Sequence, residues 1–274
     1  QLLLQGSSKA LGFSAQFPAH QLDTQYEWDD LILPQATAKH LTELQLWLKH
    51  AGALRDEWGM YKSLPQGYKA LFYGPPGTGK TLTAALLGKM LTKLVYRIDL
   101  SQVVSKYIGE TEKNLERIFL KAEQNNWILF FDEADALFGK RTSVNSSNDR
   151  NANMETGYLL QRIEACSNLV IMASNLKDNI DEAFLRRFQS IIHFTNPDVK
   201  ERLKLWQKGF STKADVSQIN FTALAKEHSL SGAEINNCIR YASLMALEHH
   251  AGVIHTSDIV SAIQREKFKS GQYV

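Results

Sequence analysis

Residues 69–87 have the sequence "KALFYGPPGTGKTLTAALL", in which a short apolar run, a loop of glycine and proline, and an apolar helical pattern follow one another. This order of strand, loop and helix is the context in which the pattern G-x-x-x-x-G-K-[ST] forms a phosphate-binding loop. A turn that fits the pattern by chance is the alternative, and the flanking strand and helix argue against it. The sequence therefore predicts a site for a nucleotide phosphate.

The residue types of this loop suit that chemistry. Glycines let backbone N–H groups point at phosphate oxygens, where side chains would obstruct the approach, and the following helix adds its dipole. Lys80 supplies a positive charge for the β and γ phosphates, and the Thr81 hydroxyl supplies a ligand for Mg²⁺. The residues that we expect to bind the nucleotide here are Gly74, Pro75, Pro76, Gly77, Thr78, Gly79, Lys80, Thr81 and Leu82.

Around this loop, short apolar runs alternate with helical patterns. The runs are "KALFYG" (69–74), "LVYRIDL" (94–100), "WILFFDE" (127–133), "LVIMASN" (169–175) and "SIIHFT" (190–195). Strands that alternate with helices form parallel sheets covered by helices on both faces. The predicted fold class is therefore α/β, a P-loop NTPase domain with a five-stranded parallel sheet.

The two ends of the chain differ from this central part. Residues 1–27 have mixed composition and are interpreted as a lead-in, whereas apolar positions from Ala36 to Trp58 recur at helical spacing. After Asn196 and Pro197 only helical patterns remain, over 199–208, 221–228, 232–250 and 256–267. We therefore expect an αβα domain over 28–196 and a small helical lid domain over 197–274.

Polar residues follow two of the predicted strands. Asp132 and Glu133 end a buried run, and Asn175 ends the next one, at the sheet edge where open α/β sheets bind ligands. Asp132 would hold Mg²⁺ through water, Glu133 would activate the attacking water, and Asn175 would contact the γ phosphate or that water. An acidic helix start and a turn-forming asparagine are the alternatives.

Composition excludes some classes of protein. With 31 basic and 29 acidic residues the formal net charge is +2, which by itself indicates neither a nucleic acid nor an anionic membrane as partner. Cys166 and Cys238 lack a metal-binding or redox spacing, so we expect buried thiols in a reducing compartment, the cytoplasm. The sequence has no apolar run of about 18 residues that could span a membrane.

Four motifs together carry a family resemblance: "GPPGTGKT", "FFDEAD", "ASN" and "FLRRF". The chain resembles the AAA clade of the AAA+ ATPases over roughly 29–267. The resemblance implies ATP and Mg²⁺ as ligands and a hexameric ring with ATP sites between subunits. It also implies that Arg186 or Arg187 reaches the neighbouring subunit's site, with Arg187 favoured because it directly precedes Phe188. A surface arginine pair without a role is the alternative.

The same resemblance implies an adenine pocket. The lid segment "SGAEI" contains Gly232 and Ala233, which would lie beside the base, and "WDDLIL" places Asp30 and Leu31 on its other side. A helix N-cap at Ser231 explains the lid segment equally well. The glycine that follows the second segment in the family is absent here.

The stretch "SKYIGETEKN", residues 105–114, exposes an apolar pair before a glycine. At this position AAA unfoldases carry an aromatic and aliphatic loop that faces the ring's channel, so the resemblance implies that Tyr107 and Ile108 grip a threaded polypeptide. Packing against a neighbouring domain is the alternative. The polar loop 139–153 stands where the family has a second pore loop, although a solvated loop explains its composition as well.

The leading functional interpretation is a ring-forming motor that uses ATP to remodel or unfold protein substrates. The stretches "SKYIGETEKN" and "DEADALFGKRT" also resemble ATPases found with bacterial contractile injection systems. A nucleic-acid motor is the second class, and it is disfavoured because only Lys106, Lys140 and Arg141 supply charge near the pore loops. A scaffold that binds ATP without hydrolysis is the third class, and the presence of Glu133 argues against it.

Overall fold

The computed structural model describes residues 19–65, 67–100, 110–134, 147–175, 182–249, 252–269 and 271. Its centre is a sheet with the strand order β1-β3-β4-β5-β2-β6. All neighbouring strands pair in parallel except β1, which is antiparallel to β3. The strands are β1 (Ala19–Leu22), β2 (Tyr68–Tyr73), β3 (Val95–Asp99), β4 (Ile128–Asp132), β5 (Leu169–Ser174) and β6 (Ser190–His193).

The five predicted strands are confirmed, and β1 is an addition to them. Its residues lie in the segment that we interpreted as a lead-in, and they form a sixth strand at the edge of the sheet. The sequence "AHQL" has no apolar alternation that would predict a strand, and only Ala19 in it is buried. Pairing with β3, rather than local propensity, therefore makes this strand.

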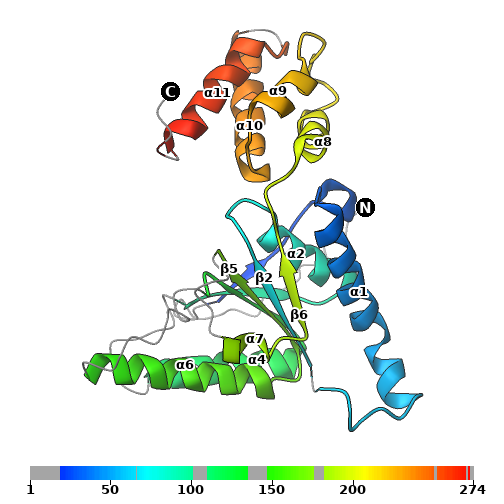
Figure 1. Ribbon diagram of the computed structural model, residues 1–274, viewed down its shortest axis with the longest axis vertical. Helices are drawn as coiled ribbons and strands as arrows, with labels where there is room; N and C mark the ends of the chain where they lie inside the picture. The colour runs from blue at the N-terminus through cyan, green and yellow to red at the C-terminus, as the bar shows by residue number, and fades with distance from the viewer. Residues whose placement is uncertain are drawn as a thin grey trace, which may run out of the picture.

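Helices cover both faces of the sheet (Figure 1). One face packs against α1 (Gln35–Asp56) and α2 (Lys80–Leu91), and the other packs against α4 (Glu110–Asn125), α6 (Ser147–Ala165) and α7 (Glu182–Leu185). Alternate residues of β4 divide between the two cores: Ile128 and Phe130 face α1 and α2, whereas Leu129 and Phe131 face α4 and α6. This explains why the run has no polar positions.

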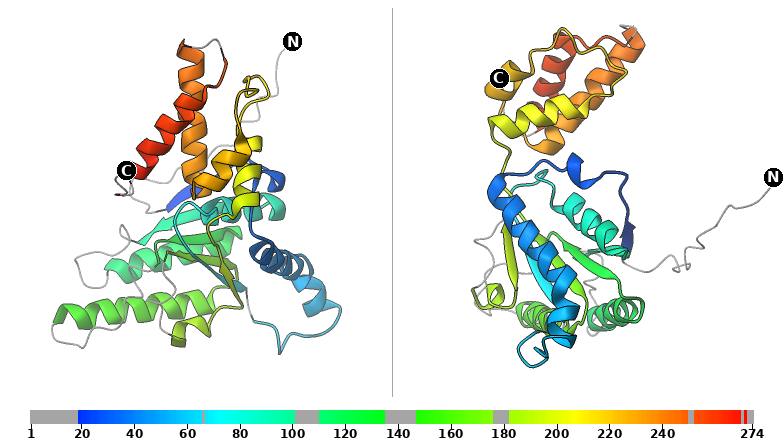
Figure 2. Two further views of the ribbon diagram at one scale, coloured as in Figure 1. Left: turned by 45° about the horizontal axis from the view of Figure 1, so that its top comes forward. Right: turned by 90° about the vertical axis from the view of Figure 1, so that its right-hand side faces the viewer.

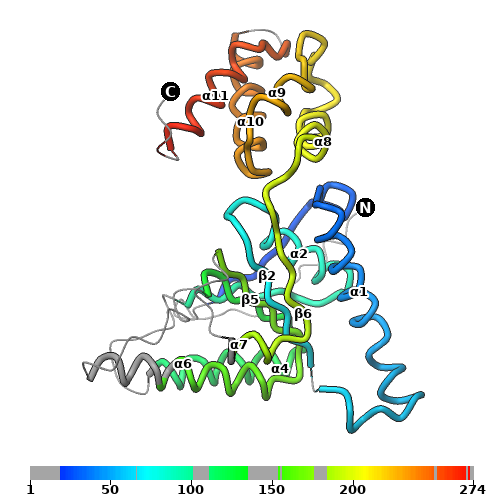
Figure 3. Tube along the Cα trace, in the orientation of Figure 1, coloured from blue at the N-terminus to red at the C-terminus, as the bar shows by residue number. Residues whose placement is uncertain are grey.

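The predicted helix before the sheet and the four predicted helices after it are also present. The last four are α8 (Val199–Gly209), α9 (Phe221–Glu227), α10 (Gly232–His249) and α11 (Thr256–Lys269), and they pack around Trp206, which is fully buried. These four helices, the lid, lie beyond one edge of the sheet, as Figure 1 and the right-hand view of Figure 2 show. A single extended segment after β6 leads into them (Figure 3).

A box of reciprocal hydrogen bonds ends that segment. The Asp198 carboxylate accepts from the Glu201 backbone N–H at 2.8 Å, and the Glu201 carboxylate accepts from the Asp198 N–H at 2.7 Å. This capping box satisfies two N–H groups that α8 cannot pair internally. Pro197 precedes it and keeps the segment before it extended.

Two further expectations can be compared with the structure. Both cysteines are buried and free, as expected. In the part of the chain that the structure describes, no helix combines the length and the apolar character that crossing a membrane requires.

Candidate functional site

A cavity of about 400 Å³ lies between the carboxyl edge of the sheet and the lid. Segments far apart in the sequence line it: the end of η1 (Trp28–Asp30) and the stretch after it, the loop between β2 and α2 with the first turn of α2, the ends of β4 and β5, the segment after β6, and α8 and α10. The lining residues are Asp30, Leu31, Ile32, Pro34, Pro76, Gly77, Thr78, Gly79, Lys80, Thr81, Leu82, Asp132, Glu133, Asn175, Thr195, Pro197, Leu205, Gly232, Ala233 and Asn236.

The loop after β2 has a backbone that requires glycine. Gly74 has φ +140°, and a Cβ atom placed on it would lie 1.8 Å from the Phe194 carbonyl oxygen on the neighbouring chain segment. Gly77 and Gly79 also have positive φ, +75° and +101°. A side chain at any of these positions would strain the loop or close its hollow. The loop therefore presents backbone, rather than side chains, to the cavity.

Lys80 is buried at the floor of the loop. Its Nζ donates to the carbonyl oxygens of Gly74 at 2.5 Å and Pro75 at 2.9 Å, and to Asn175 Oδ1 at 3.2 Å. A buried ammonium needs such partners, because desolvating an unpaired charge is costly. The lysine thereby joins the loop to the end of β5, and its charge lies where an anion entering the loop would meet it.

Asp132 and Glu133 lie across the cavity from the loop, where β4 ends. Asp132 Oδ1 accepts from the Glu133 backbone N–H at 3.1 Å, and Oδ2 lies 3.0 Å from Nη2 of Arg97 on β3. Glu133 has φ +53°, and the next N–H, of Ala134, donates to the Ala173 carbonyl at 2.9 Å. The strand thus ends in a tight left-handed turn that leaves the Glu133 side chain exposed to the cavity.

The donor set fits Mg²⁺. Thr81 and Asp132 both line the cavity and supply one hydroxyl and one carboxylate. Among the described residues, no group of three His, Cys, Asp or Glu side chains is placed to hold a metal ion. Magnesium keeps several waters and shares phosphate oxygens, so it needs only one or two protein ligands, unlike zinc in an all-protein cage.

The lid touches the loop directly. Ala233 N–H donates to the Gly77 carbonyl at 3.1 Å, and a Cβ placed on Gly77 would lie 2.9 Å from the Ala233 Cβ and the Ser231 Oγ. Ser231 also caps α10, because its Oγ accepts from the Glu234 N–H at 3.3 Å while Glu234 accepts from the Ser231 N–H at 2.7 Å. The cap and the close approach to the loop are therefore both real.

The segment after η1 forms the opposite wall. Leu31 Cδ1 lies 3.2 Å from a Cβ placed on Gly79, and the Lys208 ammonium of α8 donates to the Asp29 carbonyl at 2.8 Å. Asp30 and Leu31 thus line the same cavity as Gly232 and Ala233 of the lid. The structure brings together the two segments that the sequence placed on either side of a base.

The two arginines do not line this cavity. Both are exposed and follow α7. Arg187 Nε lies 2.8 Å from Glu164 Oε1 on α6, and its guanidinium lies 5.8 Å from the Phe184 ring centroid. Neither arginine is therefore placed to contact a ligand in the cavity of its own chain.

Two other predictions concern pore loops. Tyr107 and Ile108 lie outside the described residues. The loop expected over 139–153 is shorter than predicted, because α6 already begins at Ser147. Its polar residues lower helix propensity only slightly, and the segment 147–153 contains neither Gly nor Pro to stop a helix. Residues 139–146 lie outside the described part.

Sequence reasoning missed part of the cavity wall. Ile32, Pro34, Thr195, Leu205 and Asn236 line it, as does Pro197, which the sequence marked only as the end of the sheet region. Arg97, which pairs with Asp132, was missed as well. The local sequence around an arginine in a strand does not show which residue lies beside it on the neighbouring strand. These residues reach the site through packing of distant segments.

Comparison with known proteins points to one family of ATPases. A family model described as "ATPase family associated with various cellular activities (AAA)" matches residues 70–196. The 26S proteasome subunit RPT4 of Saccharomyces cerevisiae is 31% identical over 73% of this chain and 47% of its own length. The proteasome-activating nucleotidase of Methanococcus vannielii is 31% identical over 76% of this chain and 53% of its own length.

A third relative, the ATP-dependent zinc metalloprotease FtsH 1 of Phytoplasma mali, is 29% identical over 94% of this chain and 44% of its own length. The chain thus spans about half the length of the curated relatives that it matches. None of these three is named as part of a contractile injection system, so that narrower resemblance is without support from them.

Proposed function

The chain belongs to the AAA family of ATPases, and we propose that its cavity is the ATP site of a motor that remodels or unfolds proteins. One observation carries the proposal: a single cavity is lined by Lys80 and Thr81 at the start of α2, by Asp132 and Glu133 where β4 ends, and by Asn175 directly after β5. A positive charge, two carboxylates and an amide on three neighbouring segments are the groups that phosphoryl transfer to water needs.

Each group has a proposed task. Backbone N–H groups of the loop and Lys80 hold the β and γ phosphates, and Thr81 and Asp132 hold Mg²⁺, which neutralises phosphate charge when it is bound. The Glu133 carboxylate orients the attacking water and accepts its proton. Asn175 stays beside Lys80 Nζ and donates its amide N–H to the γ phosphate or positions the water.

Assembly into a hexameric ring is the second part of the proposal. Arg187 is exposed and lies outside its own cavity, so in a ring it can serve the neighbouring subunit's γ phosphate. The relatives named above are a proteasome subunit, a proteasome-activating nucleotidase and an ATP-dependent protease, which favours a protein substrate over a nucleic acid. We assign the grip on that substrate to Tyr107 and Ile108.

Mixing two inactive variants tests both parts. Glu133→Gln removes the base and should lower turnover by about 10²–10⁴-fold, and Arg187→Ala removes the finger and should lower turnover on the order of 10³-fold or more. In a ring, a Glu133→Gln subunit can still supply Arg187 to an Arg187→Ala neighbour with an intact Glu133. Random mixing then restores about a quarter of the interfaces.

The controls separate the possible failures. Arg186→Ala mixed with Glu133→Gln identifies which arginine acts in the neighbour. Turnover that stays absent in every mixture, while each variant forms rings by light scattering, would refute the trans role of these arginines. Wild-type protein that binds ATP with Mg²⁺ and never hydrolyses it would refute the ATPase motor itself.

A further inference from the structure

We infer that Arg97 is a positioning residue for the ATPase site, which fixes the carboxylate of Asp132 and, through it, the turn that carries Glu133. The inference deepens the proposed function and rests on it, because it concerns how the same site holds Mg²⁺. Arg97 lies on β3, one strand further from the phosphate loop than β4.

The sheet places Arg97 beside Asp132. Parallel pairing of β3 and β4 sets Asp99 opposite Asp132 and Arg97 opposite Phe130. Side chains alternate along a strand, so Tyr96 and Ile98 enter the core under α4 and α6, whereas Arg97 points to the face of α2, as Phe130 does. Asp132 lies two residues after Phe130 and therefore shares that face.

Both oxygens of Asp132 are engaged. Oδ2 lies 3.0 Å from Arg97 Nη2, and Oδ1 accepts from the Glu133 N–H at 3.1 Å. The Asp132 side chain is 18% exposed and the Arg97 side chain is 43% exposed, so the pair is shielded from solvent mainly on the aspartate side. A carboxylate with a donor on each oxygen has one preferred orientation, because rotation about χ1 or χ2 would break both contacts.

The turn at Glu133 depends on this arrangement. A left-handed φ of +53° is unfavourable for a non-glycine residue, so neighbouring contacts must maintain it. Two contacts do so: the Glu133 N–H to Asp132, and the Ala134 N–H to the Ala173 carbonyl at 2.9 Å. Arg97 holds the acceptor of the first contact in place.

Two effects of Arg97 on Mg²⁺ oppose each other. Its positive charge repels the cation, whereas its grip on Asp132 removes the need to order that carboxylate when the cation binds. The Arg97 side chain is partly exposed, so solvent screens its charge and reduces this repulsion. Pre-ordering therefore outweighs repulsion, and loss of Arg97 weakens Mg²⁺ binding.

The test measures the binding of a fluorescent, slowly hydrolysed ATP analogue, once with EDTA and once with saturating Mg²⁺. The ratio of the two Kd values is the gain due to Mg²⁺. Arg97→Met keeps the length of the side chain and removes its donors. We expect its Kd in EDTA to stay within about twofold of wild type, and its gain to fall about 10-fold, as when a group that orients a metal ligand is lost.

Three further variants make the result specific. Arg97→Lys keeps the charge with a single donor group and should restore part of the gain. Arg162→Met removes another paired arginine of the same domain, far from the cavity lining, and should lower the melting temperature without changing the gain. In an Asp132→Asn background, Arg97→Met should have no further effect on the gain, because the group through which Arg97 acts is already altered.

The outcomes are distinct. An Arg97→Met gain equal to or greater than that of wild type would overturn the inference and leave the proposed ATP site standing. An Arg97→Met effect that persists at full size in Asp132→Asn would overturn the route through Asp132. Wild-type protein whose nucleotide affinity does not respond to Mg²⁺ would overturn the proposed magnesium site itself. Should Arg97→Met fail to fold, Arg97→Lys takes its place: a gain below that of wild type would support the inference, and a gain equal to or greater than that of wild type would overturn it.

Discussion

At position 74 the backbone conformation and the surrounding atoms leave room for glycine alone. Gly74 directly follows β2, and a Cβ atom there would overlap the Phe194 carbonyl oxygen at 1.8 Å. Gly157 on α6 is its counterpart, because a Cβ atom there would meet nothing within 4 Å. The same substitution therefore has opposite consequences at the two positions.

We predict that Gly74→Ala destabilises the protein by about 2 kcal/mol or more, through backbone strain and the clash with Phe194. Gly157→Ala should stabilise it by about 0.5–1 kcal/mol, because alanine loses less entropy in a helix. Urea unfolding of both variants and wild type measures the difference. A Gly74→Ala midpoint equal to that of wild type would contradict the loop geometry.

The residues of the site also show what the sequence could predict. Lys80, Thr81, Asp132, Glu133 and Asn175 each follow a strand-like run, so their common location at one sheet edge was predictable. Arg97 was not, because its role depends on the register between β3 and β4. The lining by Thr195, Leu205 and Asn236 depends on how the lid docks, which no local pattern encodes.

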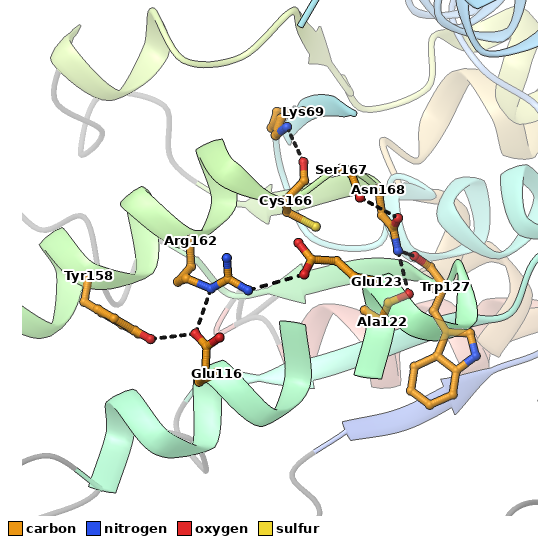
Figure 4. Close-up of polar contacts among 10 residues, drawn as sticks. All are labelled: Lys69, Glu116, Ala122, Glu123, Trp127, Tyr158, Arg162, Cys166, Ser167 and Asn168. Carbon is orange, nitrogen blue, oxygen red and sulfur yellow. Dashed lines mark hydrogen bonds and ion pairs between the residues drawn. The ribbon is translucent and has the colours of Figure 1, made fainter. Parts of the chain in front are cut away.

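At the level of single elements, α4 and α6 are joined by a polar network (Figure 4). Tyr158 donates to Glu116 at 2.8 Å, and Arg162 lies 2.9 Å from Glu116 and 3.5 Å from Glu123. Burial and hydrogen bonding to Glu116 raise the pKa of Tyr158 to about 12, so it remains a donor over the physiological range. The network ties together the helices that follow both predicted pore loops.

Other contacts in the same region fix the start of β5. Asn168 donates to the carbonyls of Ala122 at 2.6 Å and Trp127 at 3.0 Å, and the buried Lys69 ammonium donates to the Cys166 carbonyl at 2.7 Å (Figure 4). Burial lowers the pKa of Lys69. These side chains satisfy carbonyls at the ends of α4 and α6 that helices leave unpaired. No sequence pattern indicated these contacts.

The end of α9 provides a pH-dependent test. His228 Nδ1 is buried and has no hydrogen-bond partner among the described residues, and burial together with Lys267 lowers the pKa of this histidine below 6.5. The unfolded chain takes up the proton first as the pH falls, so stability that is complete above pH 6.5 declines below it.

We therefore predict that His228→Gln makes stability less dependent on pH between 6.5 and 5. Urea midpoints at several pH values measure this, with the exposed His40 of α1, changed to Gln, as the matched control. His40→Gln should keep the wild-type slope. A His228→Gln slope identical to that of wild type would show that the histidine is not protonated unequally in the two states.

For the molecule as a whole, the sheet domain and the lid have separate hydrophobic cores, and few contacts join them. Trp206 centres the lid core, and the sheet is packed separately on each face. The links include the segment after β6, the hydrogen bond from Ala233 to Gly77, and that from Lys208 to Asp29. The cavity lies among these links, so its shape depends on how the lid docks.

A bulkier residue at the contact between Ala233 and Gly77 should change nucleotide affinity without changing stability. We predict that Ala233→Leu pushes the lid from Gly77 and weakens ATP-analogue binding about 10-fold, whereas the melting temperature without nucleotide stays within a few degrees, since neither core changes. Ser261→Leu, on the exposed side of α11, is the control and should change neither quantity. Unchanged affinity in Ala233→Leu would mean that the lid contact does not shape the site.

The short strand β1 has a consequence for how the chain can be shortened. It covers the outer edge of β3, whose backbone groups would otherwise form an open row on which a foreign strand could add. Among the described residues this cover consists of four, Ala19–Leu22. A fragment designed from the helix at Gln35 onward would keep every residue of the nucleotide loop but lose β1. The edge of β3 would then be open, and copies of the fragment could associate through it.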